Sequence, residues 1–144
     1  MIKSAQGLIL LFLFLFSSMQ AFALDAPAAC PTVDAIKNAG LSGVMEDKRY
    51  NVYAVYQISR YSTPTTWGFF IAVPSDQAIS REDATNKAKE ALRTVSGQPN
   101  PTAVDDTQKR WYCWYDNAYH YVSVAVTPLM GQAEIKGAMQ TRRQ

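Results

Sequence analysis

The sequence contains few of the residues on which enzymes most often depend. It has one histidine, His120, and two cysteines, Cys30 and Cys113, in 144 residues. The patterns G-x-S-x-G, C-x-x-C and H-E-x-x-H do not occur in it. These absences argue against a nucleophile-elbow hydrolase, a zinc protease and covalent haem attachment through C-x-x-C-H. Every histidine-dependent mechanism would have to use His120. We therefore expect a protein without enzymatic activity and without a bound metal.

The chain also has no large excess of positive or of negative residues. The chain has 14 Lys and Arg against 12 Asp and Glu, and without Lys3 the balance is 13 against 12. A nucleic-acid binder normally has a large or clustered positive surplus. The basic cluster here is Arg142-Arg143 near the end of the sequence, which we interpret as a solvated tail. We expect no nucleic-acid partner.

The one long apolar run lies at the start of the chain, from Leu8 to Phe16. It follows Lys3 and precedes Ala21-Phe22-Ala23, whose small residues are typical of a cleavage site. The run is too short to span a bilayer, and this order of features is that of a secretory signal peptide. We predict a signal peptide at 1–23, a mature chain from Leu24, and export to the periplasm or beyond. No later stretch is apolar enough for a transmembrane segment.

In an exported chain, two cysteines most simply pair with each other, which predicts a Cys30–Cys113 disulfide. Lipidation of Cys30 is an alternative, but Pro27-Ala28-Ala29 lacks the Leu expected three positions before a lipoprotein cysteine. A catalytic pair of Cys113 and His120 would need reduced cysteines.

Hydrophobic periodicity predicts an α+β fold with a mainly antiparallel sheet of about five strands and two helices. The first helix begins near Pro31 and ends at Gly40. The second begins at Ser80, whose capping box with Asp83 precedes one apolar face. The expected strands are 44–46, 50–59, 67–73, 110–115 and 118–126. We expect a single exported domain over 24–144, in which 128–144 is a flexible tail.

Asp116-Asn117 resembles a two-residue turn, which would make the last two strands a tight hairpin. Such a turn places Trp114 opposite Tyr119, Tyr112 opposite Tyr121, and Cys113 opposite His120. Alternation along the strands then gathers four aromatic residues on the outer face of the hairpin. This aromatic quartet is Tyr112, Trp114, Tyr119 and Tyr121.

The quartet and His120 are the candidate ligand-binding residues. Four rings on one face could bind a sugar, a porphyrin or a peptide. They could equally stabilise the hairpin as cross-strand pairs or lie beneath a helix. For His120, the alternative is a hydrogen-bonded residue at the edge of the sheet.

The Cys-Pro-x-Val-x-x-Ile-x-x-x-Gly stretch from Cys30 to Gly40 and the W-Y-C-W-Y motif from Trp111 to Tyr115 carry a family resemblance. The chain resembles a family of small exported bacterial proteins of unknown function, some of them labelled hemin-binding. The resemblance implies a possible haem ligand and supplies no catalytic residues. An exported haem binder typically offers Tyr or His to the iron.

We therefore predict an exported, non-enzymatic binding or interaction protein, with haem or an extracellular or host protein as its partner. The alternative is a small secreted hydrolase or an enzyme inhibitor that acts outside the cytoplasm.

Overall fold

The computed structural model describes residues 26–103 and 110–129. The signal peptide predicted at 1–23 and residues 130–144 of the predicted tail lie outside these described residues. The described residues form an α+β fold with an antiparallel sheet, as the sequence predicted. Its elements in chain order are α1 (Val33–Ala39), β1 (Gly43–Asp47), β2 (Val52–Ser59), β3 (Trp67–Pro74), a 3-10 turn (Ser75–Gln77), α2 (Arg81–Arg93), β4 (Thr102–Ala103), β5 (Trp111–Tyr115) and β6 (Val122–Thr127).

The sheet has six strands in the order β1-β2-β3-β6-β5-β4, and each strand pairs antiparallel with its neighbours. Five of the six overlap the strands expected from periodicity, although β6 begins at Val122 and not at residue 118. The sixth, β4, was missed because it is only two residues long and directly follows Pro99 and Pro101, which favour a loop. It forms one edge of the sheet, beside β5.

The helix α2 lies across β1, β2 and β3. The helix begins directly after Ser80, the capping residue that the sequence predicted. The Ser80 side chain accepts a hydrogen bond from the Asp83 N–H. Its apolar stripe is buried as the spacing indicated, with Ala84, Ala88 and Ala91 fully inaccessible. Small side chains let the helix backbone lie close to the sheet.

The helix α1 is short and begins two residues after the predicted start. Pro31 therefore precedes the helix, and the Thr32 side chain caps it by accepting a hydrogen bond from the Ala35 N–H. Gly40 ends it in the left-handed region at φ 73°, and its N–H donates to the Ile36 carbonyl. Ile36 is fully buried, so the helix contributes one anchoring side chain to the core.

The predicted disulfide is confirmed. Cys30 and Cys113 are bonded, with 5.8 Å between their Cα atoms, across a sequence separation of 83. The bond ties the segment before α1 to the middle of β5. Lipidation of Cys30 and a reduced, catalytic Cys113 are both incompatible with this bond.

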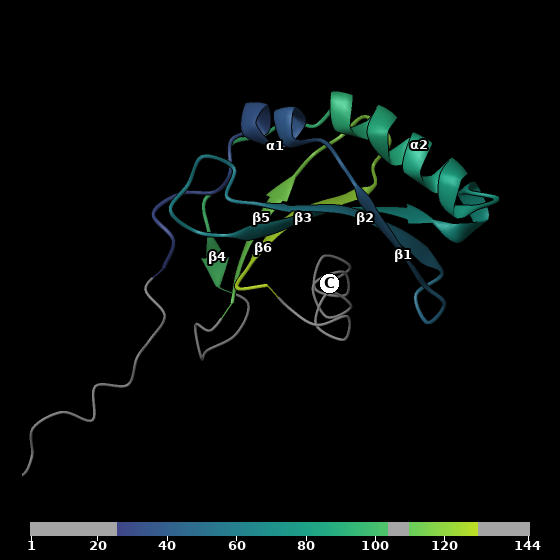
Figure 1. The fold of residues 1–144 in the computed structure, drawn as a ribbon, viewed down its shortest axis with the longest axis horizontal. Helices are drawn as coiled ribbons and strands as arrows, with labels where there is room; N and C mark the ends of the chain where they lie inside the picture. Colours follow the sequence, from purple (N-terminus) through teal and green to yellow (C-terminus); the bar gives the residue numbers. More distant parts are fainter. Residues whose placement is uncertain (1–25, 104–109, 130–144) are drawn as a thin grey trace, which may run out of the picture.

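The two faces of the sheet each carry buried apolar side chains. Figure 1 shows α1 and α2 together on one of them, which we call the helix face. Its core includes Val55, Phe69, Ile71, Cys113 and Tyr115. The opposite face, which we call the second face, consists of Val52, Ala54, Phe70, Ala72, Tyr112, Val124 and Val126, with Met45, Tyr50, Tyr56, Trp114 and Val122 packed around them.

Candidate functional site

The strands β5 and β6 pair in a different register from the predicted hairpin. Tyr115 lies opposite Ser123, and Cys113 lies opposite Ala125. The prediction of a two-residue turn at Asp116-Asn117 is therefore wrong. Residues 116–121 form a longer loop between the strands. The reason is the Asn117 side chain, whose Oδ1 accepts hydrogen bonds from the N–H groups of Tyr119 and Tyr121. These bonds close an Asx-type turn around Asn117 instead of a tight hairpin turn.

The four residues of the predicted aromatic quartet consequently do not share one surface. Tyr112 and Trp114 belong to the second face, with their ring centroids 5.9 Å apart. Tyr121 is buried in the core of the helix face, and Tyr119 is 45% exposed. His120 is exposed in the loop and is not the cross-strand neighbour of Cys113. Trp111, Cys113 and Tyr115 lie on the helix face, whereas Val122 and Val124 lie on the second face.

Three connections hold the 116–121 loop in place. The Asn117 Nδ2 donates to the Tyr121 carbonyl over 2.6 Å and to Ser123 Oγ over 2.8 Å. The Ala118 N–H donates to Thr94 Oγ1 at the end of α2. The backbones of Ser96 and Asp116 exchange two hydrogen bonds. The loop is thus a fixed part of the domain, anchored to both β6 and α2.

The fixed loop presents Tyr119 and His120 to solvent. His120 has φ 57°, a left-handed conformation in which histidine is several-fold enriched among non-glycine residues, and its N–H donates to the Asn117 carbonyl. The rings of Tyr119 and Tyr121 are stacked, with centroids 5.7 Å apart and an angle of 22° between their planes. Within the described part of the chain, the His120 imidazole makes no hydrogen bond. A phenol and an imidazole from neighbouring positions are therefore available to a ligand.

Sequence reasoning missed Asn117, Ser123 and Thr94, the side chains that position this loop. Asn117 carried a signal, because asparagine favours turns closed by its own side chain. Ser123 and Thr94 carried none, since their contacts depend on the register of β6 and on where α2 ends.

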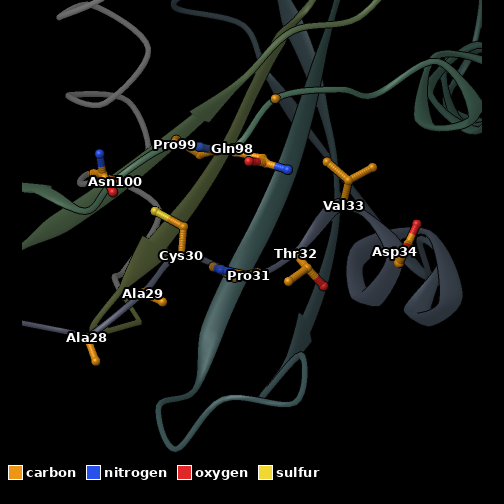
Figure 2. A pocket seen from close by; sticks show the side chains of 11 residues that line it. Ala28, Ala29, Cys30, Pro31, Thr32, Val33, Asp34, Gln98, Pro99 and Asn100 are labelled. Atoms are coloured by element: carbon orange, nitrogen blue, oxygen red, sulfur yellow. The ribbon is translucent and has the colours of Figure 1, made fainter.

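The recess in Figure 2 is a different feature, beside the disulfide. It has a volume of about 440 Å³ and lies between the segment 28–34 and the loop 97–100. Asp34 is the charged residue of its lining, and none of the five candidate residues contributes to it. A smaller recess of about 380 Å³ lies between residues 26–29 and 62–65. Neither recess offers an imidazole or a phenol to a ligand.

Two buried tyrosines are structural and not reactive. The Tyr115 hydroxyl donates to the Pro31 carbonyl, and the Tyr61 hydroxyl donates to the Gln57 carbonyl, both over 2.6 Å. Burial raises the pKa of both phenols well above the ordinary tyrosine value, and the pKa of Tyr115 is raised further by Tyr61. Both remain protonated at neutral pH, as donors that hold the chain near Cys30 and near the end of β2.

Among residues 26–103 and 110–129, no three His, Cys, Asp or Glu side chains are grouped to hold a metal ion. In the same residues, no helix has the length and apolar character needed to cross a membrane.

A family model described as a domain of unknown function (DUF4949) matches residues 29–130. The match includes both cysteines, all six strands and the 116–121 loop. No curated protein and no solved structure matches the chain.

Proposed function

This chain belongs to the DUF4949 family, and from that premise we propose that it is an exported, non-enzymatic protein that binds hemin at the 116–121 loop. The family description names no activity, so the proposal rests on the chain itself. The hydrolase or inhibitor considered from the sequence stays a prediction.

The observation that carries the proposal is the pairing of an exposed phenol and an exposed imidazole on an anchored loop. Tyr119 and His120 are consecutive, and the Asn117 side chain fixes the backbone that bears them. Tyrosine and histidine are axial ligands that proteins use for haem iron. The Tyr121 ring stacked on Tyr119 limits the rotation of that phenol and supports its use as a ligand.

Two further observations support export and this ligand class. A disulfide is compatible with an oxidising compartment outside the cytoplasm. The resemblance noted from the Cys30 and Trp111 motifs is to exported bacterial proteins, some of them labelled hemin-binding.

The proposal is tested by titrating the purified protein with hemin and following the Soret band. We expect a shifted band that saturates at one equivalent. Tyr119→Phe should remove the phenolate ligand and alter the band. His120→Asn should remove the imidazole, while asparagine also tolerates the left-handed backbone.

The matched control is Tyr50→Phe, which removes the hydroxyl of a half-buried tyrosine in the turn between β1 and β2 and should leave the titration unchanged. A band that never saturates, or one that both loop variants leave unaltered, would contradict the proposal.

A further inference from the structure

The second face is buried although neither described helix lies on it. Tyr112, Val124 and Val126 are each 2% exposed, and Phe70 is 6% exposed. Figure 1 shows both described helices on the opposite side of the sheet. An apolar sheet face normally needs a second layer to exclude water. Something beyond the described elements therefore covers this face.

The chain leaves β6 toward the second face. A Cβ built on Gly68 would lie 3.2 Å from Leu129 Cδ2 and 2.9 Å from a ring carbon of Phe70. Because Gly68 and Phe70 are two residues apart in β3, they point to the same face. Leu129, the last described residue, thus already lies on the second face beside Phe70.

The sequence that follows Leu129 has the length and the composition to cover this face. Residues 130–144 include Ile135, Ala138 and Met139, whose spacing would place them on one side of a helix. Fifteen residues of helix span roughly 22 Å. The four strands β2, β3, β6 and β5 extend over roughly 14 Å, at a strand spacing of about 4.8 Å.

We propose that residues 130–144 pack across the second face through Ile135, Ala138 and Met139 and form the layer opposite α1 and α2. The sheet is then enclosed on both sides. The segment predicted as a flexible tail becomes part of the hydrophobic core. This inference is independent of hemin binding, because the 116–121 loop is anchored through α2 and β6 and not through the second face.

Trp114 provides the reporter for a test. It lies with the second face, whereas Trp67 and Trp111 belong to the core of the helix face. In a variant that ends at Leu129, we expect the tryptophan emission to shift to the red and acrylamide quenching to increase. The same comparison in a Trp114→Phe background should show neither change, which assigns the signal to Trp114.

Point variants keep the test valid if the shortened chain does not fold. Ile135→Glu should reproduce the red shift, and the neighbouring Lys136→Glu should not. Equal quenching of Trp114 in the full chain and in Ile135→Glu would overturn the proposal. So would a full chain that is dimeric and exposes Trp114 only on dilution to the monomer, since a second copy would then be the cover.

Discussion

Asn117 and Ser123 are joined by a buried hydrogen bond between the start of the β5–β6 loop and the strand β6. The Asn117 Nδ2 donates to Ser123 Oγ over 2.8 Å, and Asn117 is only 7% exposed. The same side chain also binds three backbone groups of Tyr119 and Tyr121. One residue therefore determines the shape of the proposed binding loop.

Asn117→Ala should lower the free energy of unfolding by about 2 kcal/mol, because it leaves buried polar groups of the loop without partners. It should also weaken hemin binding. Urea unfolding measures the first effect, and amide hydrogen exchange at Tyr119 and Tyr121 measures the opening of the loop. Asn86→Ala, at an exposed position on α2, is the control and should change neither. Unaltered exchange at both amides would show that Asn117 does not hold the loop.

Removal of the disulfide should destabilise the protein strongly. In the chain-entropy account, a crosslink that closes a loop of this length contributes about 4–5 kcal/mol. The double variant Cys30→Ala with Cys113→Ala should lose most of that amount in urea unfolding. Adding a reducing agent to the wild type should give a similar loss and should not affect the variant. A variant as stable as the oxidised wild type would refute the role given to this bond.

The alanine face of α2 should not tolerate charge. Ala88→Glu places a carboxylate without a partner in the core of the helix face, and we expect a loss of about 3 kcal/mol. Asn86→Glu introduces the same group at an exposed position of the same helix and should cost little. Thermal unfolding compares the two, and equal shifts in Tm would contradict the assigned face.

The protein should lose stability in alkali. Since burial raises the pKa of Tyr61 and Tyr115 in the folded state, the fold favours their protonated forms. Their contribution is complete below the ordinary tyrosine pKa of about 10, and it is lost as the pH rises above that value.

Urea unfolding between pH 9 and about 11.5 should show this decline. Tyr115→Phe should be less stable at pH 7, because it loses the bond to Pro31, but should decline less steeply with pH. The same slope in the wild type and the variant would exclude Tyr115 as a cause.

The elements that the sequence predicted well are those determined by local chemistry. The start of α2 depends on a local hydrogen bond, from the Asp83 N–H to the Ser80 side chain three residues earlier. The buried face of the helix follows from the spacing of the apolar residues between Ala84 and Leu92. The disulfide was predictable because only two cysteines were available. The short strand β4 was not, since pairing with β5 alone makes it a strand.

The candidate site was predicted in part. Tyr119, Tyr112, Trp114 and Tyr121 were grouped through a register that the structure contradicts, and Tyr119 and His120 are the two candidates that lie exposed in the loop. Asp116-Asn117 is compatible both with a tight turn and with a turn closed by the asparagine side chain. Two hydrogen bonds decide between these turns, one from the Asn117 side chain to Ser123 and one from the Ala118 N–H to Thr94. Both contacts exist only in the folded chain.

The location of the binding surface is tested most directly by NMR with gallium protoporphyrin IX, a diamagnetic substitute for hemin. We expect the amide signals of residues 117–121 to shift and to saturate at one equivalent, with smaller shifts at Thr94 and Ser123. Signals of the recess residues 28–34 and 97–100 should stay in place. Saturating shifts in the recess, or small unsaturated shifts over the whole chain, would contradict the account.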